Sequence, residues 1–341
     1  MFFMIPSNRK KIIITESLPH VNQQIEILSK YGEVVVLNSI NEDVIKEAAK
    51  DADVIVIVYA KITDKIIENA AKLKGIVRCG IGVDNINLEA ATKRGIVVAN
   101  VPDYAITTVA DHAFALILSL VRKVMKWDLY VREGRYVGRW TSPPQELIGA
   151  DMDGKTLGLV GFGKIGREVA RRAKGFNMKV LVFDPYISKE LAEQMGVELV
   201  DLDTLLRNSD IVSLHAPLTK ETYHIINEDR LKLMRKNAYI VNTSRGPLID
   251  EIALYKALKE GWIGGAALDV FEVEPLPPDN PLLKLDNVIL TPHIAWFTEE
   301  ALQRLEYTAV EEAIRILKGE LPKNLVNKDV LKVLELRKAG T

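Results

Sequence analysis

Cysteine is almost absent from this chain: Cys79 is its only copy in 341 residues. An internal disulfide framework is therefore excluded, and a single thiol fits a reducing compartment. An excess of charge of one sign is also missing, because 45 Lys and Arg oppose 46 Asp and Glu for a net charge of -1. That balance gives no electrostatic reason to expect a nucleic acid or a membrane surface as a partner.

Long apolar runs are missing as well, since none has the length that crosses a membrane. The apolar helix expected from about Thr107 to Met125 is interrupted by Asp111 and Lys123, which favours a packed helix over an anchor. The start, Met1–Pro6, is apolar but lacks the length and order of a signal peptide. We therefore expect a cytoplasmic protein.

The sequence does contain a repeated alternation of apolar strand patterns with amphipathic helix patterns. This alternation predicts an α/β fold of parallel sheets with helices on both faces. The alternation stops near residue 103 and resumes near residue 155. A domain of residues 103–297 is thus expected to be inserted into a domain made of 1–102 plus 298–341. The strand patterns lie at 11–15, 34–37, 54–58, 75–78, 96–100, 156–160, 180–183, 211–214, 238–242, 264–269 and 288–291, the principal helix patterns at 21–30, 41–50, 64–73, 107–125, 164–173 and 298–318, and an exposed excursion rich in Gly, Arg, Trp and Pro at 134–144.

A glycine motif, Gly161-x-Gly163-x-x-Gly166, stands between the strand pattern at 156–160 and the helix pattern at 164–173. The order of strand, glycine turn, helix, strand and acid is the fingerprint of a dinucleotide-binding unit. Gly161 would permit the tight turn, Gly163 would let the backbone approach a pyrophosphate, and Gly166 would let helix and strand pack closely. The helix start supplies N–H groups and a partial positive charge to the anion.

Asp184 ends the strand pattern that follows the glycine motif. A carboxylate there would accept hydrogen bonds from an adenosine ribose and repel a 2′-phosphate, which favours NAD over NADP. The next residues, Pro185 and Tyr186, bring no arginine that would offset this charge. We therefore expect NAD as the cofactor.

Polar residues also follow three later strand patterns, where ligands bind in sheets of this kind. Arg245 stands in the loop after 238–241, Glu274 in the loop after the strand that ends at Leu268, and His293 in the loop after the strand that ends at Leu290. Each residue taken singly has a plainer interpretation, as a surface ion-pair partner, a solvated acid or a loop histidine. Together they are expected to converge on the nicotinamide end of the cleft.

These segments resemble the D-isomer-specific 2-hydroxyacid dehydrogenase family. The resemblance rests on the glycine fingerprint and on residues 78–85, 209–219, 234–246, 268–275 and 291–293. It implies two doubly wound parallel-sheet domains, with a Rossmann NAD-binding domain inserted into a flavodoxin-like substrate domain. It also implies NAD-dependent interconversion of a 2-keto acid and a D-2-hydroxy acid, catalysed by Arg245, Glu274 and His293.

The roles that the resemblance implies agree with the chemistry of the three side chains. Arg245 would bind the substrate carboxylate and carbonyl oxygen, for which the rigid donor fork of a guanidinium is suited. His293 would act as general acid in reduction and general base in oxidation. Glu274 would hold the other imidazole nitrogen and favour the protonated ring. The loop Gly80-Ile81-Gly82 would bring backbone N–H groups to the carboxylate.

The family match also implies the residues that line the cofactor, and Asp269 among them would lie near the nicotinamide carboxamide. We expect no metal site. The family match implies a homodimer built around the region of the 107–125 helix. The predicted cofactor-binding set comprises Gly161, Gly163, Lys164, Ile165, Gly166, Asp184, His215, Ala216, Pro217, Thr222, Thr243, Ser244, Arg245, Asp269 and His293.

The substrate is less determined than the reaction. Trp296 and Arg78 resemble the C-terminal-binding-protein branch of the family. Trp296 would add an apolar wall that favours a hydrophobic or thioether 2-keto acid, and Arg78 would either contact a carboxylate or pair with Asp84. The alternatives are a phosphoglycerate dehydrogenase, a glyoxylate reductase, or an NAD(H)-sensing scaffold with slight catalysis. A formate dehydrogenase is disfavoured, because that branch carries glutamine at the position of Glu274.

Two further residues invite functional interpretations that we consider weaker. Cys79 lies beside the substrate loop, but only Arg78 argues for a lowered thiol pKa, so a small buried residue is the simpler interpretation. His112 lies within an apolar helix pattern and is expected to be a packed or hydrogen-bonded histidine.

Overall fold

The computed structural model describes residues 9–136 and 144–339, which form two compact units. One unit comprises residues 1–105 and 298–341, and the other comprises residues 106–297. The first boundary thus falls at 105/106, whereas the sequence pattern placed it at 102/103. The apolar start Met1–Pro6 and residues 137–143 of the expected excursion lie outside the described residues.

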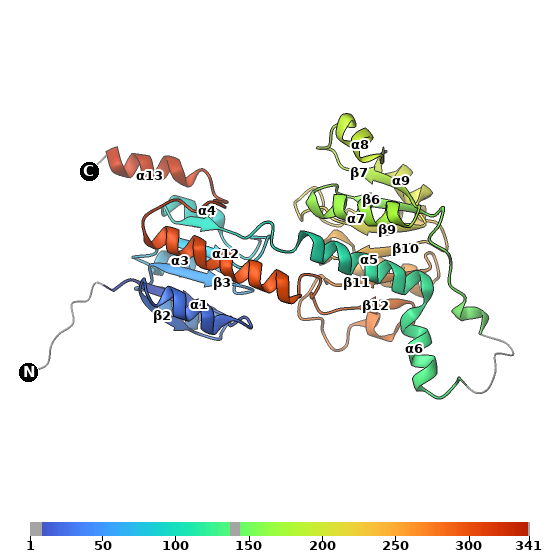
Figure 1. Ribbon diagram of the computed structural model, residues 1–341, viewed down its shortest axis with the longest axis horizontal. Helices are drawn as coiled ribbons and strands as arrows, with labels where there is room; N and C mark the ends of the chain where they lie inside the picture. Colours follow the sequence, from blue (N-terminus) through green and yellow to red (C-terminus); the bar gives the residue numbers. More distant parts are fainter. Residues whose placement is uncertain (1–8, 137–143, 340–341) are drawn as a thin grey trace, which may run out of the picture. The chain divides into compact units, whose positions relative to one another are not determined.

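The first unit is built on a parallel sheet of five strands in the order β2-β1-β3-β4-β5 (Figure 1). This is the order of a flavodoxin-like sheet, the type of domain that the family resemblance implies. One face of the sheet packs against α2, α3 and α4, and α12 packs against α1 and strands β3 and β4. The elements are β1 (Lys11–Ile14), α1 (Val21–Leu28), β2 (Glu33–Val36), α2 (Glu42–Ala49), β3 (Val54–Ile57), α3 (Asp64–Asn69), β4 (Gly75–Arg78), α4 (Leu88–Lys93), β5 (Val97–Ala99), α12 (Glu299–Leu317) and α13 (Val330–Ala339).

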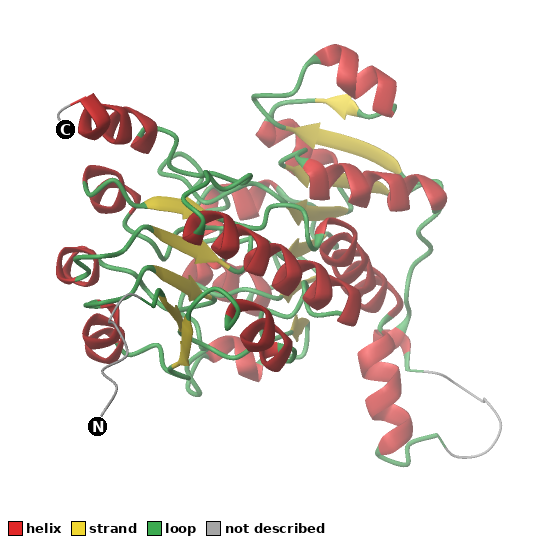
Figure 2. Ribbon diagram, turned by 60° about the vertical axis from the view of Figure 1, so that its left-hand side comes forward, coloured by secondary structure: helices red, strands yellow, loops and turns green. Residues whose placement is uncertain are grey.

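The second unit contains a parallel sheet of seven strands in the order β12-β11-β10-β9-β6-β7-β8. The order reverses direction between β6 and β9, as in a Rossmann fold, and ligands bind outside the carboxyl ends of strands at such a point. Figure 2 shows the helices on both faces of the strands. The elements are α5 (Ile106–Arg122), α6 (Val124–Arg132), η1 (Gln145–Leu147), β6 (Thr156–Val160), α7 (Lys164–Gly175), β7 (Lys179–Phe183), α8 (Lys189–Met195), β8 (Glu198–Leu199), α9 (Leu202–Asn208), β9 (Ile211–Leu214), α10 (Glu228–Leu233), β10 (Tyr239–Asn242), η2 (Gly246–Leu248), α11 (Glu251–Lys259), β11 (Gly265–Leu268), η3 (Pro281–Lys284) and β12 (Val288–Leu290).

The local sequence explains why these elements form. Strands β3, β9 and β11 are buried along their whole length, which accounts for their continuous apolar runs. Helices begin at residues whose side chains accept hydrogen bonds from the first turn, such as Asn41 before α2, Asp250 before α11 and Thr298 before α12. Helices α5 and α7 cover one face of the seven-stranded sheet, and α9, α10 and α11 cover the other.

The single helix expected at 107–125 is wrong, because the chain divides it into α5 and α6 at Lys123. Lys123 adopts a left-handed backbone with φ of 57°. The Val121 carbonyl accepts its hydrogen bond from Ala150 N at 3.1 Å, and Lys123 Nζ lies 3.1 Å from the Tyr239 hydroxyl. Contacts distant in sequence thus end α5. None of the described helices is both long enough and apolar enough to cross a membrane.

Candidate active site

The loops that carry Arg245, Glu274 and His293 follow three neighbouring strands of one sheet. Arg245 comes three residues after β10, Glu274 follows β11, and His293 follows β12. Strand β11 pairs in parallel with both β10 and β12, so the three carboxyl ends share one edge. The sheet order therefore brings together loops that are far apart in sequence.

Glu274 and His293 are in direct contact at this edge. His293 Nδ1 lies 2.7 Å from Glu274 Oε2, and the two side chains are 28% and 34% exposed. The other carboxylate oxygen, Oε1, accepts a hydrogen bond from Phe271 N at 3.0 Å. Burial by itself would raise the pKa of Glu274. The net effect is a lowered pKa, because the carboxylate is stabilised by the hydrogen bond and charge of His293, by the Phe271 N–H and by the charge of Arg245. An ionised Glu274 orients the His293 ring through Nδ1.

The His293 loop is wrapped around the buried carboxylate of Asp269. Asp269 Oδ1 accepts hydrogen bonds from Thr291 Oγ1 at 2.6 Å and Ile294 N at 2.9 Å, and Oδ2 accepts one from Ala295 N at 2.8 Å. The Asp269 carbonyl accepts the His293 N–H at 2.8 Å. His293 itself has φ of 56°, a conformation that a non-glycine residue keeps only when its surroundings hold it. Asp269, which the resemblance implies as a nicotinamide contact, therefore holds the His293 loop in shape.

His112 extends this anchor from α5. Its Nε2 lies 3.2 Å from Thr291 Oγ1, whose hydroxyl donates in turn to Asp269. The expectation of a hydrogen-bonded histidine is confirmed, and the contact joins α5 to the loop that carries the predicted general acid.

The Arg245 loop is fixed by its own backbone. Asn242 Nδ2 donates to the Arg245 carbonyl at 2.8 Å, and Arg245 Nη1 donates to the Ser244 carbonyl at 2.8 Å. Gly246 packs so closely against the next loop that a Cβ there would lie 1.9 Å from the Phe271 carbonyl carbon. A side chain at this position would push apart the loops that carry Arg245 and Glu274.

The glycine motif forms the turn between β6 and α7 that the sequence predicts. Gly161 has φ of 95°, and a Cβ there would lie 2.6 Å from Ala216 N in the loop after β9. A Cβ on Gly166 would lie 2.5 Å from the Gly161 carbonyl oxygen, whereas one on Gly163 would meet no atom of the described residues within 4 Å. Two glycines thus permit close packing within the protein, and the third leaves open space at the start of α7, as approach of a pyrophosphate requires.

Asp184 lies at the end of β7 beside this turn. Its Oδ2 accepts the Phe162 N–H at 2.7 Å, and its Oδ1 accepts the Tyr186 N–H at 2.9 Å. The sequence motif did not reveal this bracing of the glycine turn. A carboxylate has about four acceptor positions, so these two bonds leave capacity for ribose hydroxyls.

The loops after β9 and β10 hold further members of the predicted cofactor set. Among the residues that the structure describes, Thr243 offers a buried hydroxyl without a hydrogen-bond partner. An orphaned oxygen at the carboxyl end of a central strand fits a polar ligand. Ser244 Oγ donates to the Ala216 carbonyl at 2.7 Å. His215 Nε2 lies 2.9 Å from Ser213 Oγ, and burial lowers the pKa of His215 to about 4, so its ring is neutral at pH 7.

Other members of the cofactor set serve the shape of the loops. Thr222 Oγ1 donates to the Pro217 carbonyl at 2.7 Å and accepts the Thr219 N–H at 2.7 Å, so its hydroxyl holds the loop after β9. Lys164 and Ile165 form the first turn of α7, the former exposed and the latter partly buried.

The predicted substrate loop, residues 80–82, follows β4 in the first unit. Gly80 has φ of 144°, and the Arg78 guanidinium occupies the space that a Cβ on Gly80 would take. Arg78 Nη1 donates to the Cys79 carbonyl, and Asn100 Nδ2 donates to the Ile81 carbonyl at 2.7 Å. These contacts fix the path of the loop and fold Arg78 back over it.

Cys79 is buried in the first unit, and its burial raises the thiol pKa to about 12. A thiol with this pKa is not a nucleophile at neutral pH, so the interpretation as a small buried residue is confirmed.

Trp296 lies three residues after His293. Its Nε1 donates to the His293 carbonyl at 3.0 Å, and its ring meets Phe297 edge-on at 5.3 Å between centroids. The indole thereby bonds to the backbone of the predicted general acid, a contact that no sequence motif predicts.

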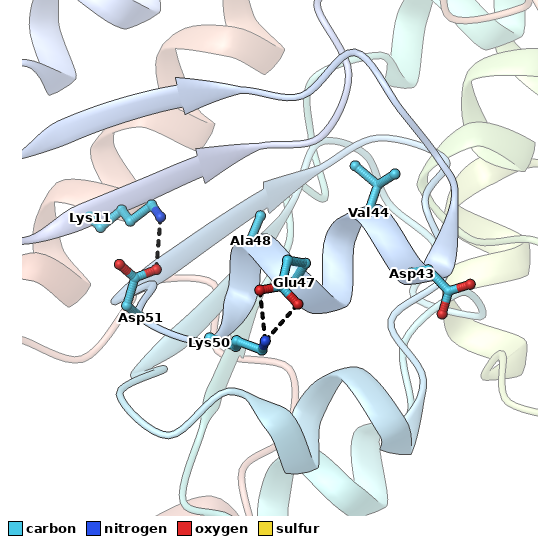
Figure 3. A pocket seen from close by; sticks show the side chains of 7 residues that line it. All are labelled: Lys11, Asp43, Val44, Glu47, Ala48, Lys50 and Asp51. Carbon is cyan, nitrogen blue, oxygen red and sulfur yellow. Dashed lines mark hydrogen bonds and ion pairs between the residues drawn. The ribbon is translucent and has the colours of Figure 1, made fainter.

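A pocket of the first unit lies beside α2 and the start of β1 (Figure 3). Four of its charged groups form two ion pairs, since Lys11 lies 2.7 Å from Asp51 and Lys50 lies 2.6 Å from Glu47. None of the catalytic candidates lines it; the lining residues are Lys11, Asp43, Val44, Glu47, Ala48, Lys50 and Asp51.

His224 forms a pair with Glu272, which lies in the Glu274 loop, and no sequence motif points to this pair. His224 Nε2 contacts Glu272 Oε1. Both residues fall inside or beside segments that carry the family resemblance, but a histidine and an acid 48 residues apart give no local signal of contact.

Comparison with known proteins agrees with this geometry. The model of the NAD-binding domain of D-isomer specific 2-hydroxyacid dehydrogenases matches residues 114–295. The chain belongs to this family. It is 49% identical over 294 residues to the glyoxylate reductase of Korarchaeum cryptofilum, covering 86% of this chain and 88% of that protein.

Other members of the family are also similar to this chain over most of its length. The D-3-phosphoglycerate dehydrogenase of Methanocaldococcus jannaschii is 47% identical over 319 residues, covering 93% of this chain but 59% of that protein. The structure of D-lactate dehydrogenase from Aquifex aeolicus complexed with NAD and lactic acid superposes with a TM-score of 0.84 at 32% identity, covering 93% of this chain and 99% of that one. This member of the family is therefore an NAD-dependent oxidoreductase that acts on 2-hydroxy acids.

Proposed function

We propose that this dehydrogenase reduces a small 2-keto acid, glyoxylate in the first place, and that Arg245, Glu274 and His293 carry the reaction. The contact of 2.7 Å between His293 Nδ1 and Glu274 Oε2 is the observation that best supports these roles. It is the arrangement of a general acid held by a carboxylate, and it follows strands that are neighbours in the sheet.

In this proposal His293 gives a proton to the substrate carbonyl oxygen from Nε2. The Nδ1–H donates to Glu274, whose lowered pKa keeps the carboxylate ionised and so stabilises a protonated ring. General acid catalysis of this kind contributes about 10²–10⁴ in rate. In the direction of oxidation the same nitrogen accepts the proton of the hydroxyl.

Arg245 binds the substrate carboxylate and polarises the adjacent carbonyl. A guanidinium offers paired donors in a fixed plane, which matches a carboxylate next to a carbonyl oxygen. NADH, when bound, supplies the hydride. Trp296, three residues after His293, borders the substrate.

The cofactor would be held along the carboxyl edge of β6, β7, β9 and β10. Gly161, Gly163 and Gly166 would admit the pyrophosphate to the start of α7, with Lys164 and Ile165 in its first turn. Asp184 would accept from the adenosine ribose, and Thr243 Oγ1 would gain the partner that it lacks among the described residues. The wall of the cofactor site would be formed by two loops of the predicted cofactor-binding set. The loop after β9 would contribute residues His215 to Pro217 and Thr222, and the loop after β10 would contribute Ser244.

Glyoxylate is favoured because the relatives at 49% and 45% identity over most of the chain are named glyoxylate reductases. Phosphohydroxypyruvate is the second candidate, supported by the phosphoglycerate dehydrogenase at 47% identity. A hydrophobic or thioether 2-keto acid, which Trp296 suggests, is the third.

A panel of substrates tests the proposal. NADH oxidation is followed with glyoxylate, hydroxypyruvate, 3-phosphohydroxypyruvate and branched or thioether 2-keto acids, and each product is analysed for chirality. We expect the highest kcat/KM with glyoxylate, and a D product from every acid that yields a chiral centre. Absence of turnover with all acids, combined with assembly driven by NADH, would favour the scaffold alternative.

We further propose a homodimer that uses α6. Helix α6 buries none of its residues, and Val124, Met125, Leu129 and Val131 are between 51% and 57% exposed. Four exposed apolar side chains on one short helix fit a subunit interface. Sedimentation of Leu129→Glu should give a monomer where the parent protein gives a dimer; a monomeric parent contradicts the proposal.

A further inference from the structure

His224 and Glu272 form a contact that the proposed mechanism does not use. His224 Nε2 meets Glu272 Oε1, and the two side chains are 27% and 28% exposed. The other ring nitrogen, Nδ1, lies 4.0 Å from Asp250 Oδ2. The imidazole thus lies between acids from two different loops, and we call its contact with Glu272 the clasp.

The backbone of His224 is bonded to the segment that directly follows Arg245. His224 N donates to the Pro247 carbonyl at 2.8 Å, and Ile226 N donates to the Leu248 carbonyl at 3.0 Å. Asp250 N donates back to the Ile226 carbonyl at 2.9 Å. These bonds make residues 224–226 and 247–250 a single short ladder, so the clasp begins on the Arg245 side of the site.

Glu272 lies in the loop that carries Glu274. Its N–H donates to Glu251 Oε2 at 3.2 Å, while the preceding Phe271 N–H donates to the Glu274 carboxylate at 3.0 Å. A displacement of residue 272 would therefore move the N–H that holds Glu274. The clasp ends, accordingly, on the Glu274 side of the site.

The conformation of His224 indicates that its surroundings fix the ring. Its φ of 48° lies in the left-handed region, which a non-glycine residue keeps when neighbouring contacts compensate its cost. The ring stacks on Tyr223 with 4.0 Å between centroids and 17° between planes. Stacking on one side and the Glu272 carboxylate at the edge leave the imidazole a single orientation.

We propose that the clasp of His224 and Glu272 positions the Glu274 loop against the Arg245 loop, and so keeps the His293–Glu274 pair in register with the bound carboxylate. Neither residue touches the reacting atoms, so both are positioning residues. The inference rests on the proposed roles of Arg245, Glu274 and His293. A misplacement of about 1 Å in such a group can cost about 10²-fold in rate, which makes a remote clasp measurable.

Three variants of the full protein separate the side-chain contact from the backbone conformation. His224→Asn tolerates the left-handed backbone but is too short to reach Glu272. His224→Gln is strained in that backbone but carries a donor at nearly the reach of Nε2. Glu272→Gln keeps the shape of the acid and removes its charge. Glu198→Gln, which breaks the Lys179–Glu198 pair of 2.8 Å at the start of β7 and β8, is the matched control.

We expect His224→Asn and Glu272→Gln each to lower kcat for glyoxylate about tenfold, because the general acid is displaced, with KM for NADH unchanged. His224→Gln should retain more activity than His224→Asn even if it melts at a lower temperature. The double variant His224→Asn with Glu272→Gln should be no slower than the slower single variant, since both remove one contact. The control should match the parent protein.

Two results would overturn the clasp. One is a parent-like kcat in all three variants; the other is a fall in activity that follows the melting temperature, with Asn better than Gln at position 224. Glu274→Gln and His293→Asn are measured in parallel. If these two leave turnover intact, the proposed catalytic roles fail; if they abolish it while the clasp variants do not, the positioning inference fails by itself.

Discussion

The two halves of the seven-stranded sheet achieve order by different means. In the glycine half, the loops after β6 and β9 make close backbone contacts that a Cβ would block, as at Gly161, and the Asp184 side chain after β7 braces the turn. In the other, catalytic half, Gly246 allows one close backbone contact, but the His293 loop is held mainly by side chains, such as Asp269 beneath it. The first half depends more on the absence of a Cβ, and the second depends more on which side chains meet.

This difference has a consequence for mutation. Substitutions at the closely packed glycines of the glycine half should lower cofactor affinity and stability together. Side-chain contacts in the catalytic half should let turnover change while cofactor affinity stays constant. The following predictions would break or sharpen that contrast.

The largest effect is expected at His293. His293→Asn tolerates the left-handed backbone but removes the proton donor, so kcat should fall at least about 100-fold. NADH affinity, measured by fluorescence titration, should stay within about twofold, because the loop keeps its Asp269 bonds. Unchanged kcat would remove His293 from the mechanism, and a parallel loss of NADH binding would erase the contrast between the halves.

In the glycine half, Gly161→Ala should weaken NADH binding and stability together. The new Cβ would lie 2.6 Å from Ala216 N, at a residue with φ of 95°. We expect a loss of about 1–3 kcal/mol in unfolding free energy, with a weaker Kd for NADH. Gly175→Ala is the control, because a Cβ there meets nothing within 4 Å in the part of the chain that the structure describes. A destabilised Gly161→Ala that binds NADH normally would contradict the proposed cradle.

At Asp184 the expected effect is on cofactor choice. Asp184→Asn keeps an acceptor for the Phe162 N–H but removes the charge, so the preference for NADH over NADPH should fall about tenfold. Asp184→Ala removes the brace as well and should also weaken NADH binding. Ratios of kcat/KM for the two cofactors give the result, and an unchanged ratio in Asp184→Asn would show that the charge does not select the cofactor.

The smallest effect at neutral pH is expected at His215. Its folded pKa of about 4 lies below the ordinary 6.5, so the unfolded chain binds a proton more readily between these values. Stability is therefore unaffected above pH 6.5 and declines as the pH falls toward 4, by about 2 kcal/mol at pH 5. His215→Gln should lose less stability between pH 7 and 4.5 in urea unfolding. An equal loss would place the acid sensitivity elsewhere.

Much of the fold could be predicted because its signals are local. Apolar runs at β3 and β9, cap residues such as Asn41 and the spacing of the glycines each describe a few adjacent residues. The break at Lys123 was not predicted, since it depends on the Val121 carbonyl bonding Ala150 from another segment. The clasp of His224 and Glu272 was missed for the same reason.

By itself, the sequence determined the alternation of strands and helices, the glycine turn and the identity of the three polar residues at strand ends, because period, spacing and residue type act over short stretches. Only the tertiary structure decided that β10, β11 and β12 are neighbours, that Glu274 meets His293, and that Asp269, Thr291 and His112 support the loop. Those contacts join segments up to 179 residues apart, and their formation depends on the order of strands in the sheet.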